Sequence, residues 1–114
     1  MNLGLDLLDI ARMERRLTSE GFMRRCFTAE ERAYIARKGA GAAQTAAGIF
    51  CAKEALAKAT GTPLLRVLRH SEVLHTASGQ PYFNLPGVSL SISHTAATAA
   101  AVVLCTTAPE GDIL

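Results

Sequence analysis

The amino-acid sequence predicts one α+β domain that spans residues 1–114. Three features indicate this class: alternating apolar residues near both ends, an alanine-rich helical segment at residues 45–60, and the absence of Asp, Glu, Lys and Arg from residues 73–109. A chain of 114 residues has room for a single domain. Its 49% hydrophobic and 19% charged residues can fill a core, which excludes a disordered chain.

Charge and cysteine content exclude several kinds of partner. The net charge is only +2, so no domain-wide basic field would attract nucleic acid or an anionic membrane. Three widely spaced cysteines predict neither a disulfide framework nor a zinc site. Asp6 and Asp9 interrupt the apolar N-terminus, and no stretch is apolar for long enough to cross a bilayer. We therefore expect a cytoplasmic protein with neither nucleic acid nor membrane as a partner.

The uncharged segment at residues 73–109 predicts a sheet that is buried on both faces. Its serines alternate with apolar residues, and glycines and prolines interrupt it, so it is not a membrane span. A short chain has few helices with which to cover both faces of a sheet. We expect a subunit interface to provide the second cover.

Local patterns predict the elements of the N-terminal part. Residues 3–8 alternate as a strand, which places Asp6 on the face opposite Leu5 and Leu7. Apolar residues then recur at helical spacing over residues 10–17, so a short arginine-bearing helix follows the strand.

A second helix is expected at residues 28–38, because Thr28 and Glu31 have the spacing of a capping box. After a short flexible loop, residues 45–60 predict the longest helix, which Gly61 ends.

Strands are expected in the last third of the sequence. Residues 72–76 and 82–85 flank a turn and predict a hairpin, and residues 88–93 alternate serine with apolar side chains. A last strand is expected at about residues 98–104.

Two carboxylates could bind a hard cation. Asp6 and Glu54 each lie on the less apolar side of their element, and Mg²⁺ is commonly held by one or two protein carboxylates. Alternatively, Asp6 makes local contacts and Glu54 pairs on the helix surface with Lys58. The ammonium groups of Lys53 and Lys58 could neutralise a pyrophosphate, or they could simply belong to a solvated helix face.

Two further groups of residues could carry function. In the segment from Ser91 to Thr95, a serine-rich strand ends at His94. This segment could carry chemistry, or His94 could simply be a hydrogen-bonded histidine in a turn. Five arginines form a local basic cluster that either meets an acidic protein surface or is solvated. These are Arg12, Arg15, Arg16, Arg24 and Arg25.

Taken together, the motifs resemble those of the holo-acyl-carrier-protein synthases, members of the 4′-phosphopantetheinyl transferase superfamily. The matching residues are in order and cover nearly the whole chain. They are Gly4-Leu5-Asp6, Phe27-Thr28 with Glu31, Phe50 to Ala55 with Lys58, Gly61-Thr62, Gly79-Gln80-Pro81, and Ser91 to Thr95.

The resemblance implies a 4′-phosphopantetheinyl transferase-like fold, with a mainly antiparallel sheet packed against a long helix, and a homotrimer with clefts between subunits. It also implies an enzyme of fatty acid biosynthesis that transfers 4′-phosphopantetheine from coenzyme A to a serine of an apo acyl carrier protein. The other product would be adenosine 3′,5′-bisphosphate. The alternative is a catalytically inactive module of the same fold that binds the carrier protein or coenzyme A.

The resemblance also implies roles for individual residues. Asp6 and Glu54 would hold Mg²⁺, Glu54 would take the serine proton through a water, and Lys58 and Lys53 would balance phosphate charge. Residues expected on the nucleotide side are Gly79, Pro81, Ser93, His94 and Thr95. Residues expected to bind the acidic carrier are Arg12, Arg15, Arg16 and Arg24.

Three departures from the family pattern bear on coenzyme A binding. Ile49 stands where an arginine is usual, so the phosphate contact made there is either missing or supplied from elsewhere, for example by Arg37 or Lys38. Pro63 replaces a glycine and removes one backbone N–H donor. The connection from Pro81 to Val88 is also shorter than usual.

Overall fold

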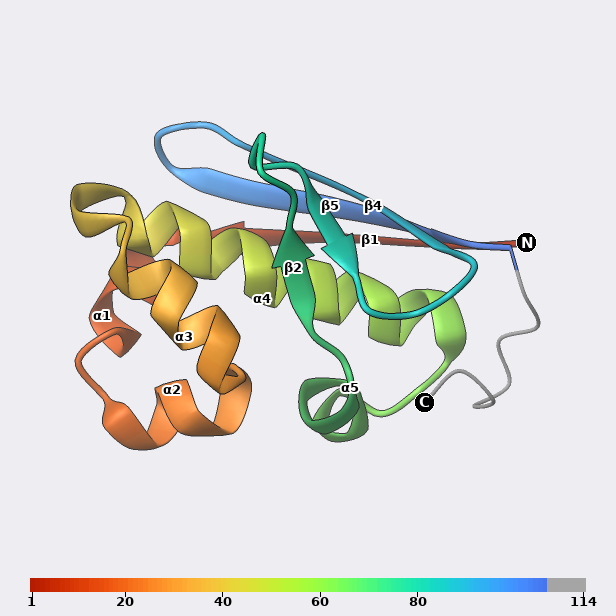
Figure 1. The fold of residues 1–114 in the computed structure, drawn as a ribbon, viewed down its shortest axis with the longest axis horizontal. Helices are drawn as coiled ribbons and strands as arrows, with labels where there is room; N and C mark the ends of the chain where they lie inside the picture. Colours follow the sequence, from red (N-terminus) through yellow and green to blue (C-terminus); the bar gives the residue numbers. More distant parts are fainter. Residues whose placement is uncertain (107–114) are drawn as a thin grey trace.

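The computed structural model of the chain describes residues 1–106, so residues 107–114 of the predicted domain lie outside the description. A three-stranded sheet lies along one side of a long helix, and the shorter helices and a small hairpin lie around that helix (Figure 1). The elements in chain order are β1 (Asn2–Asp9), α1 (Ile10–Arg16), α2 (Glu20–Cys26), α3 (Ala29–Ala36), η1 (Gly39–Gly41), α4 (Ala42–Thr60), α5 (Leu64–His70), β2 (Val73–His75), β3 (Pro81–Phe83), β4 (Val88–His94) and β5 (Thr98–Cys105).

The sheet is antiparallel, in the order β1-β5-β4, and the hairpin β2–β3 forms a separate two-stranded sheet. The register places Asp6 opposite Ala101, and Ala101 opposite Ile92. Residues directly opposite in a sheet share a face, so these three side chains form one row. Ala101 is buried, which shows that this row faces the core and α4.

Gly4 lets strand β1 pass very close to helix α4. A Cβ atom built on Gly4 would lie 1.9 Å from the carbonyl oxygen of Ala55 and 2.9 Å from the backbone nitrogen of Ala59. Both of these are backbone atoms that cannot rotate away, so no side chain fits here. Asp6, two residues farther along the same face, is thereby brought against the same helix.

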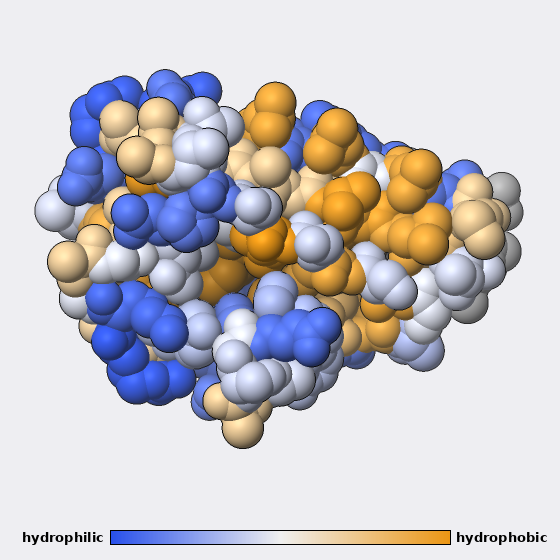
Figure 2. All heavy atoms as spheres, turned by 90° about the horizontal axis from the view of Figure 1, so that it is seen from above, coloured by the Kyte–Doolittle hydropathy of each residue, from blue (hydrophilic) through white to orange (hydrophobic). Residues whose placement is uncertain are grey.

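The other face of the sheet is apolar and open in the single chain. Leu3, Leu5 and Leu7 are 69%, 59% and 65% exposed, and Val102 is also exposed. Figure 2 shows hydrophobic side chains gathered over this side of the molecule. Single exposed apolar residues are ordinary, but a contiguous apolar patch marks a surface that binds a partner. The expectation that a second subunit covers this face stays a prediction.

The structure confirms the predicted strands and the two capped helices to within a few residues. Thr28 and Glu31 form the capping box, and Gly61 ends α4 with a left-handed φ of 66°. Helix α4 begins at Ala42, earlier than expected, because the small residues before it continue the helix instead of forming a loop.

Helices α2 and α5 were not predicted from the sequence. Each has seven residues, too few for a helix to be stable by itself. Tertiary packing stabilises α2, whose Phe22 ring lies 6.3 Å from the Phe27 ring and 6.2 Å from the Phe50 ring.

Within residues 1–106, no helix is both long enough and apolar enough to cross a membrane.

Gly4→Ala should destabilise the fold, by about 1–3 kcal/mol, because the new methyl group overlaps the backbone of α4. Urea unfolding would measure this loss. Gly21→Ala is the matched control: its Cβ meets nothing within 4 Å, and alanine favours the helix that Gly21 occupies. Equal stability of the Gly4→Ala variant and the wild type would contradict the close approach.

Candidate active site

Asp6, Glu54 and Lys58 come together where β1 crosses α4. The Lys58 ammonium donates hydrogen bonds to Asp6 Oδ1 at 3.1 Å and to the Leu5 carbonyl at 3.0 Å. The Asp6 side chain is 11% exposed, whereas that of Lys58 is 56% exposed. Lys58 therefore reaches from solvent to a largely buried carboxylate.

Glu54 lies in the electrostatic field of both partners. Its pKa is raised, first by burial and then by the Asp6 carboxylate, while Lys58 acts in the opposite direction. Glu54 and Lys58 are four residues apart, so they share one face of α4, as predicted. Two carboxylates that repel each other on a partly desolvated surface form a site that a hard cation would stabilise. Asp6 and Glu54 therefore fit Mg²⁺ by ligand chemistry.

A metal site made of protein ligands alone does not form here. No group of three or more His, Cys, Asp or Glu side chains comes together in the part of the chain that the structure describes. Burial, followed by the neighbouring Asp6 carboxylate, raises the pKa of the Cys51 thiol to about 12. Cys51 thus stays protonated and is neither a thiolate ligand nor a nucleophile.

A cavity of about 250 Å³ lies over the first half of α4. Its lining includes Gly79 and Pro81 of the hairpin and His94 of β4, three residues predicted for the nucleotide side. Ile49 lines it as well, at the position where the family usually has an arginine.

An aromatic stack forms a wall of this cavity. The rings of Tyr34 and His75 lie parallel, with centroids 3.7 Å apart, and the Lys38 ammonium lies 4.6 Å from the Tyr34 ring centroid. Burial, then Lys38, lowers the pKa of His75. No pattern in the sequence indicates a role for Tyr34 or His75. Their stacking, which joins α3 to β2, is the observation that identifies them as part of the cavity wall. Lys38 was already a candidate from the sequence, as a phosphate contact in place of the arginine absent at Ile49.

Ser93 and Thr95 are the sequence neighbours of His94, but they do not line this cavity. Ser93 pairs with Ala100, which pairs with Leu7, so its side chain belongs to the outer face of the sheet. The Thr95 hydroxyl accepts hydrogen bonds from the backbone N–H groups of Ala97 and Thr98 and thereby shapes the turn. His94 Nδ1 is 3.0 Å from the Thr95 carbonyl.

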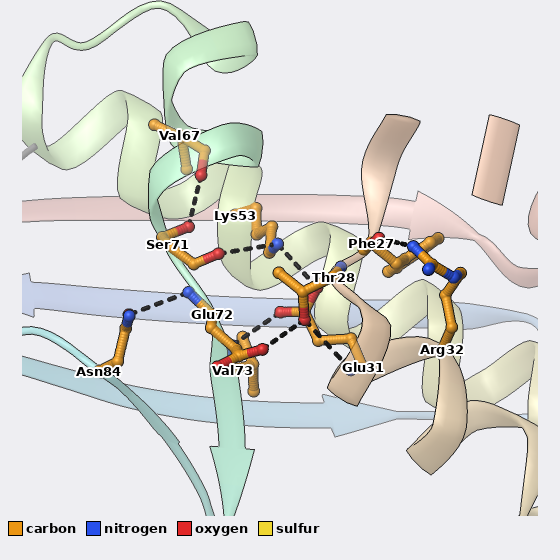
Figure 3. Close-up of polar contacts among 10 residues, drawn as sticks. All are labelled: Phe27, Thr28, Glu31, Arg32, Lys53, Val67, Ser71, Glu72, Val73 and Asn84. Carbon is orange, nitrogen blue, oxygen red and sulfur yellow. Dashed lines mark hydrogen bonds and ion pairs between the residues drawn. The ribbon is translucent and has the colours of Figure 1, made fainter. Parts of the chain in front are cut away.

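The expectation that Lys53 faces the phosphates beside Lys58 is wrong for this structure. Lys53 is fully buried, and its ammonium lies 2.8 Å from Glu31 Oε1 and 3.1 Å from the Ser71 carbonyl (Figure 3). Adjacent helix residues point about 100° apart, so Glu54 and Lys53 cannot share a face. The buried Glu31 carboxylate, which no surface pattern reveals, determines where Lys53 points.

Two of the predicted carrier-binding arginines line a second cavity, and the other two lie on α1 and α2. Arg12 and Arg16 line a cavity of about 220 Å³ together with Phe22 and Phe50, and the Arg16 guanidinium lies 5.3 Å from the Phe22 ring centroid. Arg15 is exposed nearby on α1, and the exposed Arg24 on α2 pairs with Glu20.

A family model for the 4′-phosphopantetheinyl transferase superfamily matches residues 2–106. The chain belongs to this superfamily. It is similar to the holo-[acyl-carrier-protein] synthase of Treponema denticola, at 35% identity over 91% of this chain and 96% of the relative. It is also similar to the holo-[acyl-carrier-protein] synthase of Verminephrobacter eiseniae, at 37% identity over 91% of this chain and 92% of the relative.

Solved structures of the superfamily share the fold. The Helicobacter pylori holo-[acyl-carrier-protein] synthase in complex with coenzyme A has a TM-score of 0.80 at 25% identity and covers 91% of this chain and 99% of its own. The Bacillus anthracis synthase, in complex with CoA (3′,5′-ADP), has a TM-score of 0.79 at 33% identity and covers 91% and 94%. The predicted antiparallel sheet packed on a long helix is thus the fold of this superfamily.

Glu54→Gln should raise the melting temperature in a pH-dependent way. The pKa of Glu54 is higher in the folded chain than in the unfolded chain, so the ionised carboxylate lowers stability above that pKa. The gain should be present at about pH 8 and vanish below about pH 4, where glutamate is protonated. Thermal unfolding in EDTA measures it, with Glu14→Gln on the exposed surface of α1 as the control. A gain that is equal at both pH values would contradict this electrostatic origin.

Proposed function

We propose that the chain transfers the 4′-phosphopantetheine group of coenzyme A to a serine hydroxyl of an apo acyl carrier protein. Membership of the superfamily, relatives named holo-[acyl-carrier-protein] synthase and neighbours in complex with coenzyme A support this activity. The observation that carries the proposal is the convergence of Asp6, Glu54 and Lys58 where β1 crosses α4. The same helix also borders a cavity with the hairpin and β4.

The reaction is an in-line displacement at phosphorus. The serine oxygen bonds to the β-phosphorus of coenzyme A, the bond from that phosphorus to the bridging oxygen breaks, and adenosine 3′,5′-bisphosphate leaves with the electron pair. Mg²⁺, held by Asp6 and Glu54, would supply charge stabilisation to the pyrophosphate oxygens. Lys58, exposed and free to reorient from Asp6, adds a positive charge on the same side.

Glu54 is the proposed acceptor of the serine proton, acting through a water. Burial and Asp6 raise its pKa, and a base whose pKa lies nearer to neutrality accepts a proton more effectively. Its place on α4, a long helix packed on the sheet, fixes the carboxylate relative to Lys58.

The proposed nucleotide side is the cavity with Gly79, Pro81 and His94. Lys38 is the proposed phosphate contact that takes the place of the arginine missing at Ile49. Ser93 and Thr95, at the end of β4, would reach the nucleotide only in a cleft completed by another subunit.

We propose that the carrier protein binds over α1 and α2 through Arg12, Arg15, Arg16 and Arg24, which would attract an acidic partner.

A homotrimer in which copies of the chain cover the exposed leucines of β1 would complete the clefts. A monomeric state in solution would contradict this arrangement.

The cytoplasm is the proposed location because Cys26, Cys51 and Cys105 are free, buried thiols.

Ile49 favours a second candidate, a binding module that retains the fold and the arginine surface but has no turnover. Isoleucine in the cavity wall provides no phosphate contact. The two candidates differ in whether the carrier gains mass.

The test is the intact mass of an apo acyl carrier protein after incubation with the chain, coenzyme A and Mg²⁺. We expect the carrier to gain one phosphopantetheine, and Glu54→Gln to slow the gain at least about 100-fold because it removes the proton acceptor. Glu14→Gln should transfer at the wild-type rate, and EDTA should abolish transfer. Carrier binding that weakens with salt, without any gain of mass, would instead support the binding module.

A further inference from the structure

We propose that the buried Glu31–Lys53 ion pair is a positioning element for coenzyme A. It fixes the start of the hairpin β2–β3, which forms one wall of the nucleotide cavity. The inference rests on the proposed function, because it assigns that cavity to coenzyme A.

The Glu31 carboxylate is a junction of three elements (Figure 3). Its Oε1 accepts hydrogen bonds from the Lys53 ammonium of α4 and from the Thr28 backbone N–H at the start of α3, both at 2.8 Å. Its Oε2 accepts from the Val73 backbone N–H at 2.7 Å, where β2 begins.

Three successive residues before and at the start of the hairpin are held by this junction. Lys53 donates to the Ser71 carbonyl, the Thr28 hydroxyl donates to the Glu72 carboxylate, and Val73 donates to Glu31. The chain at residues 71–73 is therefore tied to both α3 and α4.

The hairpin depends on such external contacts. Its strands have three residues each and only three register pairs, and an isolated hairpin is marginally stable at best. Yet it supplies His75, Gly79 and Pro81 to the cavity wall. A displacement of residues 71–73 would move this wall, while Asp6, Glu54 and Lys58 would stay in place on β1 and α4.

Charge at this position is difficult to explain by stability alone. Glu31 and Lys53 are 1% and 0% exposed, and well-packed apolar residues in place of a buried ion pair are often equally stable. Apolar residues could not bind the Ser71 carbonyl or the Val73 N–H, so the pair provides geometry that packing cannot. Each buried side-chain nitrogen and oxygen within residues 1–106 has a hydrogen-bond partner, so the junction is complete.

The test compares wild type with the double variant Glu31→Gln/Lys53→Met, which removes both charges at similar side-chain length. We expect the Kd for coenzyme A, measured by calorimetry, and the KM for coenzyme A each to rise about ten-fold. The kcat should stay within about two-fold, because the reacting groups are untouched.

A matched control separates positioning from stability. Val103→Ala opens a cavity in the core of β5, outside the junction, and should lower the melting temperature without changing the KM. Mere loss of folded protein would reduce the apparent kcat at constant KM, which is the opposite pattern. An unchanged Kd and KM in the folded double variant would overturn the proposal.

Glu72→Ala is the second variant, for use if the double variant does not fold. It removes only the partly buried bond to Thr28 and should raise the Kd about three-fold. An unchanged Kd in a folded Glu72→Ala variant would then overturn the proposal.

Wild type that binds coenzyme A without transfer would defeat the proposed function alone, since the Kd comparison would still test the junction. Wild type that does not bind coenzyme A would defeat both.

Discussion

The contact between Gly4 and helix α4 is the constraint on which the candidate active site depends. Strand β1 passes so close to the Ala55 carbonyl that a single methyl group would overlap it. Because strand side chains alternate, the close approach at Gly4 also brings Asp6 to the helix, two residues farther along the core face of β1. Lys58 can then reach Asp6, and the Asp6 carboxylate can raise the pKa of Glu54. A looser packing of strand on helix would leave two isolated carboxylates.

Helix α4 separates two ion pairs with different tasks. Glu54 and Lys58 lie on the face toward Asp6, in reach of solvent, where a phosphate could replace existing contacts. Lys53 lies on another face, fully buried and already paired with Glu31. Lys58, whose side chain is exposed, can leave Asp6 and contact another group during a reaction, whereas Lys53 is enclosed with Glu31. This difference makes the buried pair suited to hold the hairpin.

Local patterns in the sequence predicted those features that depend on neighbours in the chain. The alternation of residues 3–8 correctly placed Asp6 on one face of the sheet and Leu5 and Leu7 on the other. The spacing of Glu54 and Lys58 correctly placed them on one face of the helix. The direction of Lys53 was predicted wrongly because it depends on Glu31, 22 residues away in sequence. The Tyr34–His75 stack was missed for the same reason, since only a tertiary contact defines it. Helix α2 does carry a local signal, the Ser19 N-cap, but packing against Phe27 and Phe50 also stabilises it.

The most direct measurement is calorimetric titration of the chain with coenzyme A, in Mg²⁺ and in EDTA, for wild type and Asp6→Asn. If Asp6 and Glu54 hold a cation against the pyrophosphate, wild type should bind coenzyme A at least about ten-fold more tightly in Mg²⁺ than in EDTA. Asp6→Asn should lose this difference. Equal affinity of the wild type in Mg²⁺ and EDTA, or an undiminished effect of Mg²⁺ in Asp6→Asn, would contradict the account.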